Sequence, residues 1–268
     1  MAFRFARAGV VTAVTAAIVA LAAPPASAYT SDDLYLFRSS NDCLWGQAVV
    51  DWKGTAGIAS DVANVSSSWA WYPPMYCAWL YDRPAGWLAT SIQNWKWNGS
   101  SWYLCRDSGF LYNRSQSASN SYTWKLGIAC GTGWSGTMGQ VFVWRDNSWQ
   151  GGSVWSGAER FTIISGAGTN NADAADVPPL PAWVMPDGTV DVAKLPETVG
   201  VVGPDGRPTG QIVNPKELAA PPLLSTAPGP RVDPPGVVRT SNTVVPESGP
   251  QYTVEKVTLT DVYRGRLG

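Results

Sequence analysis

Between residues 29 and 165, short runs of alternating apolar and polar side chains are separated by Gly, Ser and Asn. Gln140, Phe142 and Trp144 alternate with two valines, which is the two-residue period of a pleated strand. The pattern predicts strands over residues 34–38, 44–52, 69–72, 76–81, 87–97, 102–106, 122–126, 140–145 and 160–165. No segment combines a helical period with caps. We therefore expect an all-β domain, a sandwich or barrel of short antiparallel strands.

Two segments 47 positions apart repeat one pattern. Gly86-Trp87, Trp97 and Ser101-Trp102 recur as Gly133-Trp134, Trp144 and Ser148-Trp149. In each copy four polar residues separate two tryptophans, which is the length of a hairpin loop and brings the two rings together across the strands. The repeat is either a duplicated ligand-binding unit or a hairpin retained for folding, and we favour the second interpretation.

Composition changes near Gly166, after which proline becomes dense: 16 of the 21 prolines lie between Pro178 and Pro250. Proline lacks an amide donor and disfavours helix in the residue before it. Residues 166–268 are therefore predicted to form a mostly disordered, extended tail. Two segments of it have strand character, namely a strand, turn and strand over residues 199–213 and a terminal strand over residues 251–263.

The first 28 residues have the organisation of a secretory signal peptide. Arg4 and Arg7 precede an apolar run over residues 8–23, and Ala26-Ser27-Ala28 is a small-residue cleavage site. We predict cleavage after Ala28 and secretion to the extracellular space. No later stretch reaches the ~18 consecutive apolar residues that a spanning helix needs, so we expect no stable membrane insertion after cleavage.

The four cysteines are Cys43, Cys77, Cys105 and Cys130. An even number at wide spacing in an exported chain predicts two disulfides. Three connectivities are possible, and the sequence does not choose among them; we favour sequential pairing, Cys43 with Cys77 and Cys105 with Cys130. Because the chain has no CxxC pair and no histidine, we expect no metal site.

The distribution of charge favours a neutral partner. Residues 29–165 carry nine basic and nine acidic side chains, and residues 166–268 carry eight and eleven. Neither segment has the basic stripe of a protein that binds nucleic acid or anionic lipid. We therefore expect a neutral polysaccharide or an extracellular protein as partner, and no nucleic acid.

Aromatic side chains dominate residues 29–165, with 26 of them against 20 Ile, Leu and Val. Most of these rings must form the core, but indole is rarely buried completely, and exposed rings suit the CH-rich faces of sugars. Trp69-Ala-Trp71 and Trp95-Lys-Trp97 each place two indoles on one face of a strand. The candidate ligand-binding residues are Trp69, Trp71, Trp95, Trp97, Trp102, Trp144 and Trp149, with Gln93, Asn94, Asn98 and Ser100 available to hydrogen-bond hydroxyls.

The types and positions of the titratable residues argue against catalysis. Without histidine there is no Ser-His-Asp triad and no Cys-His dyad. Glycoside hydrolysis needs two carboxylates, but the acidic residues of this segment lie mostly in turn-like sequence, and Arg106-Asp107 and Arg145-Asp146 are typical of solvated strand ends. We expect no catalytic residue and no cofactor; a hydrolase using Asp and Glu carboxylates remains an alternative.

Several motifs combine Trp, Gly and Cys at defined spacings: Pro84-Ala-Gly-Trp-Leu88, Trp97-Asn-Gly-Ser-Ser-Trp102, Cys105-Arg-Asp-Ser-Gly109, Tyr112-Asn113, Cys130-Gly-Thr-Gly133 and Gly151-Gly-Ser-Val-Trp-Ser-Gly157. In these motifs the chain resembles small secreted Trp/Gly-rich proteins of actinobacteria that are labelled hypothetical. The resemblance covers about residues 77–160 and excludes the proline-rich tail. It implies export, and it carries no assigned activity or catalytic residues.

The leading functional hypothesis is an exported, non-catalytic β-domain that binds neutral glycan or cell-envelope polysaccharide through exposed aromatic rings. The alternative is a secreted protein-interaction factor, such as an inhibitor or an envelope assembly component.

Overall fold

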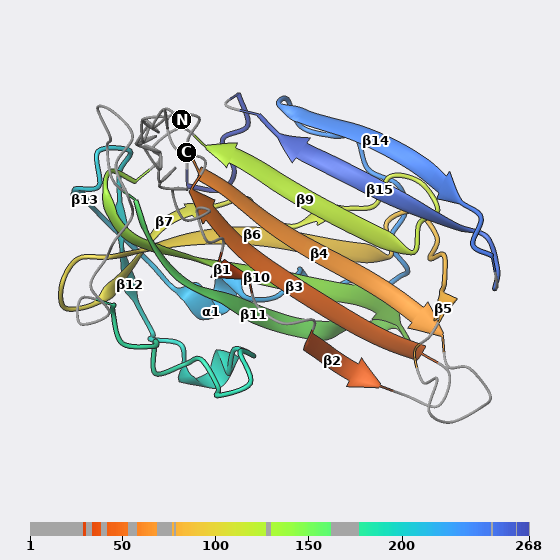
Figure 1. Ribbon diagram of the computed structural model, residues 1–268, viewed down its shortest axis with the longest axis horizontal. Coiled ribbons are helices and arrows are strands. Elements are labelled where there is room, and N and C mark those ends of the chain that lie inside the picture. Colours follow the sequence, from red (N-terminus) through yellow and green to blue (C-terminus); the bar gives the residue numbers. More distant parts are fainter. Residues whose placement is uncertain are drawn as a thin grey trace, which may run out of the picture.

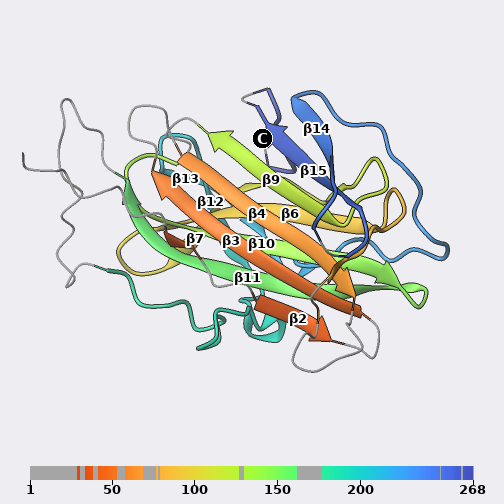
Figure 2. The ribbon, with the colours of Figure 1, turned by 45° about the vertical axis from the view of Figure 1, so that its right-hand side comes forward.

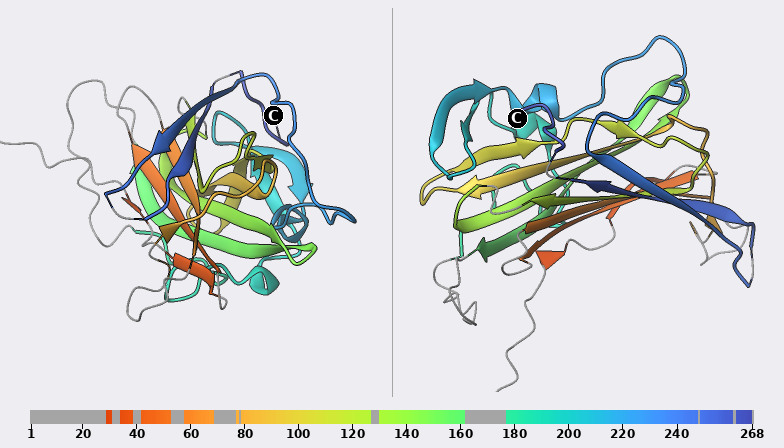
Figure 3. Two further views of the ribbon diagram at one scale, coloured as in Figure 1. Left: turned by 90° about the vertical axis from the view of Figure 1, so that its right-hand side faces the viewer. Right: turned by 90° about the horizontal axis from the view of Figure 1, so that it is seen from above.

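The structure is a computed structural model that describes residues 29–30, 34–38, 42–52, 58–68, 77, 79–126, 130–161, 177–247, 249–260 and 262–267. The predicted signal peptide (residues 1–28), the predicted strand at 69–72, and Trp69 and Trp71 lie outside these residues. Two β-sheets stack face to face (Figures 1 and 3), and we call them the first and second sheet. Within the described residues no helix has the length and apolar character needed to cross a membrane.

The first sheet has eight strands in the order β1-β3-β4-β9-β15-β14, with β2 paired to β3 and β5 paired to β4. Its strands are β1 (Tyr29–Thr30), β2 (Leu34–Arg38), β3 (Asp42–Trp52), β4 (Ile58–Ser68), β5 (Trp79–Leu80), β9 (Ser119–Leu126), β14 (Val237–Val244) and β15 (Tyr252–Leu259). Every pair is antiparallel except β15 with β9.

The second sheet has seven strands in the order β11-β10-β6-β7-β12-β13, with β8 paired to β6. Its strands are β6 (Leu88–Trp97), β7 (Trp102–Asp107), β8 (Leu111–Tyr112), β10 (Gly133–Arg145), β11 (Ser148–Phe161), β12 (Val199–Val202) and β13 (Pro208–Val213). The described helical segments are a 3-10 turn, η3 (Val192–Lys194), and one turn of α-helix, α1 (Pro215–Leu218).

The all-β prediction is confirmed, and the architecture is the sandwich rather than the barrel. Strand β3 lies against β10 and β11, while β4 and β9 lie against β6. The core between the sheets takes Ile92 and Val141 from the second sheet and Tyr122, Trp124 and Leu259 from the first. These residues alternate with outward-facing neighbours along their strands, which is the pattern that made them recognisable as strand residues.

Both repeated hairpins form as predicted. In β6 and β7, Trp97 pairs with Trp102 and their ring centroids are 5.6 Å apart. In β10 and β11, Trp144 pairs with Trp149 at 5.3 Å. Since β10 runs antiparallel to β6, the two hairpin loops lie at opposite ends of the second sheet.

The loops of the two hairpins use different turn chemistry. The second loop turns at Asp146 and Asn147, whose φ angles of 50° and 57° are those of a two-residue type I′ turn. In the first loop the Asn98 side-chain oxygen accepts hydrogen bonds from the amides of Ser100 and Ser101, at 2.9 and 2.8 Å. Asn98 and Ser100 therefore close a turn.

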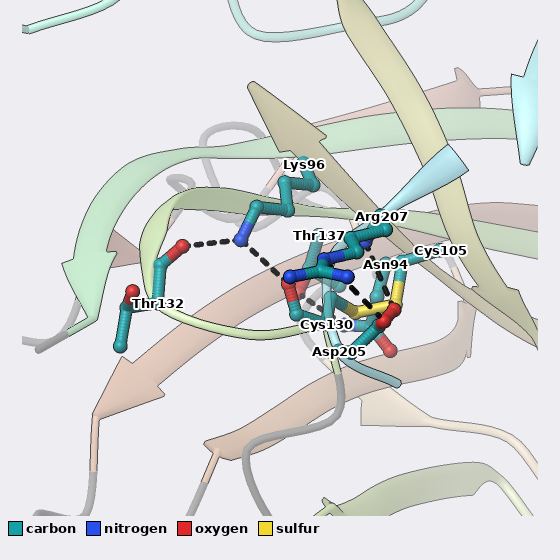
Figure 4. The surroundings of a disulfide bond; sticks show 8 residues. All are labelled: Asn94, Lys96, Cys105, Cys130, Thr132, Thr137, Asp205 and Arg207. Carbon is teal, nitrogen blue, oxygen red and sulfur yellow. Dashed lines mark hydrogen bonds and ion pairs between the residues drawn. A yellow bond between two sulfur atoms is a disulfide. The ribbon is translucent and has the colours of Figure 1, made fainter. Parts of the chain in front are cut away.

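The disulfides join Cys43 to Cys77 and Cys105 to Cys130, which is the favoured sequential pairing. Beside the second disulfide, the Lys96 ammonium donates to the carbonyls of Cys130 and Thr132 (Figure 4). Burial lowers the pKa of Lys96 below its ordinary value. The two carbonyls satisfy the buried donor and hold the chain that precedes β10 against β6.

The prediction of a mostly disordered tail is wrong for the described residues beyond 176, which supply β12 to β15 (Figures 1 and 2). The hairpin predicted over residues 199–213 is confirmed as β12 and β13, and the terminal strand as β15. Strand β12 joins β7 in parallel, and β15 joins β9 in parallel. Proline is compatible with this arrangement because the prolines occupy connections, turns and the first position of the edge strand β13.

Between β11 and β14 the tail crosses the outer face of the second sheet, away from the first (Figure 3). It contributes Trp183, Val184, Val190, Leu195 and Val199 to a second apolar core, which also contains four buried residues of that sheet, Trp95, Leu104, Met138 and Trp155. The turn of the β12–β13 hairpin packs so closely on the Cys130 segment that a Cβ at Gly206, where φ is +76°, would lie 2.5 Å from the Cys130 carbonyl oxygen. The tail is thus an integral layer of the fold.

Candidate functional site

Strand β6 carries the candidate site on its outer face. Ile92 points into the core between the sheets, so the odd-numbered residues Trp95 and Trp97 point away from it. This confirms the prediction that Trp95 and Trp97 share one face. Their cross-strand partners on β7 are Leu104 and Trp102.

Four indoles, Trp95, Trp102, Trp155 and Trp183, form one cluster on this face, which we call the indole cluster. Trp183 of the tail lies between Trp95 and Trp155, with centroid distances of 5.2 and 5.1 Å. Trp102 contacts Trp155 edge to face at 5.2 Å. Trp155 can lie across β10 because Gly136 has no side chain; a Cβ there would be 2.3 Å from the indole. Tilted and edge-to-face contacts of this kind are favourable for aromatic rings.

A groove of about 790 Å³ opens beside the indole cluster, between the first hairpin and the tail. Its lining includes the half-buried rings of Trp97, Trp102 and Tyr103 and the exposed side chains of Leu180 and Ile212. In the part of the chain that the structure describes, its polar side chains are Ser101, Tyr103, Lys194 and Thr198. Of these Lys194 is the charged one, and it ion-pairs with Asp191 at 3.3 Å. The groove is therefore aromatic, largely apolar and nearly neutral.

Each hairpin also binds a proline-rich segment of the tail through an indole. The Trp102 Nε1 donates to the carbonyl of Pro179 at 3.4 Å, and the Trp149 Nε1 donates to the carbonyl of Pro222 at 3.2 Å. Equivalent tryptophans of the repeat thus hold equivalent tail carbonyls, at opposite ends of the second sheet. These two contacts give both hairpins of the repeat a part in holding the tail.

The predicted ligand-binding tryptophans separate into distinct environments. Trp97 and Trp102 line the groove, while Trp95 is only 1% exposed and forms its floor. Trp144 is buried under Trp149, which contacts Tyr112 at 5.7 Å and lies outside the groove. The structure brings Trp95, Trp97 and Trp102 together and does not bring Trp144 and Trp149 to the same site.

The expectation that amide side chains of β6 bind ligand hydroxyls is wrong, because these side chains are buried and form hydrogen bonds within the protein. Gln93 is buried, donates to Asp107 at 2.7 Å and accepts from the Trp95 indole at 3.3 Å. Asn94 is buried on the opposite face and donates to Thr137. Both side chains were assigned to the surface because polar residues usually lie there, and on β6 both faces are covered.

Asp107 is likewise not a solvated strand end. It is fully buried, accepts two hydrogen bonds from Arg266 at 2.9 and 2.8 Å, and accepts another from the amide of Gly109. Burial raises the pKa of Asp107, and the Arg266 guanidinium opposes that rise. Only the position of the C-terminal segment could reveal this pair, because the two residues are distant in the sequence.

Sequence reasoning missed the half of the groove that the tail supplies, including Leu180, Trp183, Lys194 and Ile212. These residues carry no signal of a site, since they lie in a segment whose composition is typical of disorder. Tyr103 could have been found, because it lies beside Trp102 on a predicted strand.

No protein-family model, no curated protein and no solved structure matches the chain. Within the described ranges, no three Asp, Glu, Cys or His side chains come together in a way that could hold a metal ion.

Proposed function

We propose that the chain is an exported, non-catalytic β-sandwich that binds neutral polysaccharide in the groove beside the indole cluster. The observation that carries the proposal is that the half-buried rings of Trp97, Trp102 and Tyr103 line a groove of about 790 Å³. Flat aromatic faces pack against the CH-rich faces of sugar rings, and Ser101, Thr198 and Lys194 of the groove lining supply hydrogen-bonding groups.

Charge and the location of the carboxylates support a binding role without catalysis. Among the described residues that line the groove there is no carboxylate. Asp233 and Glu255, which lie close together elsewhere, both ion-pair with Arg239. A neutral partner suits the groove because Lys194, the cation of its described lining, is already paired with Asp191. The sequence has no histidine, which is the commonest proton-transfer group near neutral pH.

Replacing Trp97 by alanine is expected to weaken retention on an insoluble neutral polysaccharide roughly tenfold, because one stacking face is lost. Retention is measured on cellulose and on chitin with the oxidised protein, and the soluble fraction is assayed for released reducing ends, of which none is expected. The matched control is Trp79→Ala, since Trp79 is an exposed indole outside the groove.

Equal retention of Trp97→Ala and the unaltered protein would contradict the proposal, provided that the variant unfolds at the same urea concentration as the unaltered protein. A parallel loss in Trp79→Ala would indicate general adhesion of indoles to the matrix. Release of reducing ends would contradict the non-catalytic assignment.

A second candidate is recognition of a proline-rich segment in another extracellular protein. The contacts of Trp102 with Pro179 and of Trp149 with Pro222 favour it, because an indole that donates to a proline carbonyl is how aromatic grooves hold polyproline peptides. The same variants distinguish the two candidates. If the groove prefers peptide, a soluble proline-rich decapeptide will bind and Trp97→Ala will weaken it roughly tenfold, while retention on polysaccharide will be absent.

A further inference from the structure

A second pocket of about 350 Å³ lies where the end of β7 and strand β8 meet the tail. Phe110 and Tyr112 provide its aromatic surface, and Arg231, Arg239 and Arg266 of the tail provide its cations. It has no lining residue in common with the groove. Its volume is roughly ten times the ~30 Å³ that one water molecule takes up, so it has room for a molecule larger than a bare oxyanion.

Two of the three arginines are already neutralised. Arg239 binds Asp233, with Nε to both carboxylate oxygens at 2.8 and 2.9 Å, and also binds Glu255. Arg266 binds the buried Asp107 through two hydrogen bonds. Asp233, the carboxylate that lines the pocket, is therefore held by cations and repels an incoming anion only weakly.

Arg231 is the third arginine of the pocket, and unlike the other two it is not neutralised by a carboxylate of the described residues. Its guanidinium lies 4.1 Å from the centroid of the Tyr112 ring. In the described part of the chain no carboxylate lies within 4.0 Å of it, and it is exposed to the pocket. Burial raises the pKa of the Tyr112 hydroxyl, and the positive charges of Arg231 and Arg266 oppose that rise.

We propose that this pocket binds a small ring-bearing molecule that carries one oxyanion, a carboxylate or a phosphate. Arg231 and the Tyr112 hydroxyl donate to the oxyanion, and the ring lies beside Phe110. Arginine suits this role because its planar guanidinium donates two parallel hydrogen bonds to a carboxylate or phosphate. Its stacking on Tyr112 holds that plane in place before a ligand arrives.

The test is isothermal titration calorimetry of the oxidised full chain with glucuronate, inorganic phosphate and glucose as probes. The variants are Arg231→Gln and Tyr112→Phe, and the matched control is Arg207→Gln, an exposed arginine on the turn between β12 and β13.

We expect the unaltered protein and Arg207→Gln to bind glucuronate or phosphate, and glucose not to bind. In Arg231→Gln the oxyanion affinity falls roughly tenfold or more, and in Tyr112→Phe by a smaller factor. Added salt weakens the binding, since the pocket is open to solvent.

Binding of glucuronate without phosphate supports the proposal and identifies a carboxylated ring as the ligand class, whereas tighter binding of phosphate identifies a phosphorylated one. Unchanged affinity in Arg231→Gln overturns the proposal, as does equal binding of glucose and glucuronate or no binding of either oxyanion probe. Arg231 is exposed, so its replacement leaves the fold intact. The outcome is independent of the groove, because Trp97→Ala alters no residue of this pocket.

Discussion

Replacing Trp183 by alanine is expected to lower the free energy of unfolding by about 3 to 5 kcal/mol. Trp183 is only 5% exposed and lies between Trp95 and Trp155. Its removal leaves a cavity in the core between the second sheet and the tail, which the rigid sheet cannot collapse to fill. Urea denaturation followed by far-UV circular dichroism measures the loss, because this readout does not depend on the deleted fluorophore.

The control for this prediction is Leu223→Ala, an apolar residue of the same tail that is 96% exposed. It is expected to change the free energy of unfolding by no more than about 0.5 kcal/mol. If Trp183→Ala changes the free energy of unfolding as little as Leu223→Ala does, the tail does not pack on the sheet in solution. The groove and the indole cluster would then lack the residues that the tail contributes to them.

Replacing Arg239 by methionine is expected to destabilise the protein by a similar amount, about 3 to 5 kcal/mol. Arg239 connects Asp233 to Glu255, and Glu255 is 1% exposed. Removing the cation leaves a buried carboxylate without a counter-charge at the point where β14 and β15 extend the first sheet. The measurement is again the urea midpoint and slope.

Two further variants separate this effect from a general loss of charge. Arg207→Met removes an arginine that is 86% exposed, 3.9 Å from Asp205, and is expected to have almost no effect. The double variant Arg239→Met with Glu255→Gln is expected to be more stable than Arg239→Met alone by about 1 kcal/mol or more, because it no longer contains a buried negative charge without a counter-charge. If Arg239→Met behaves like Arg207→Met, the ion pairs do not hold the C-terminal strands in place.

The tail gives the two proposed sites a common architecture. In each, the second sheet supplies aromatic rings and the tail closes the opposite side: Trp97 and Trp102 face Leu180, and Tyr112 lies under Arg231. The charges of the sites differ, because the described lining of the groove has one cation and no carboxylate, while that of the pocket has three arginines. Together the two proposals predict that the chain binds a neutral chain of sugars in the groove and an anionic group in the pocket.

Much of the sandwich could be predicted because its signals are local. The alternation of Phe142 and Trp144 with valines marked β10, and the four-residue spacing of Trp97 from Trp102 marked a hairpin whose rings do meet. Strand β4, over Ile58–Ser68, was missed because its sequence is rich in Ser and Ala and has no aromatic residue. The first part of β11 was missed because Gly151-Gly152 interrupts the strand pattern.

The sequence by itself determined the class of fold, the two tryptophan hairpins and the face shared by Trp95 and Trp97, since each depends on residues only a few positions apart. Only the tertiary structure decided which indoles reach solvent. Trp95 is covered by Trp183 and Asp107 is paired with Arg266, and both partners lie far along the chain in a segment whose proline content is typical of disorder. The burial of a side chain depends on all the residues that pack around it, including residues distant in the sequence, so composition and local pattern cannot specify it.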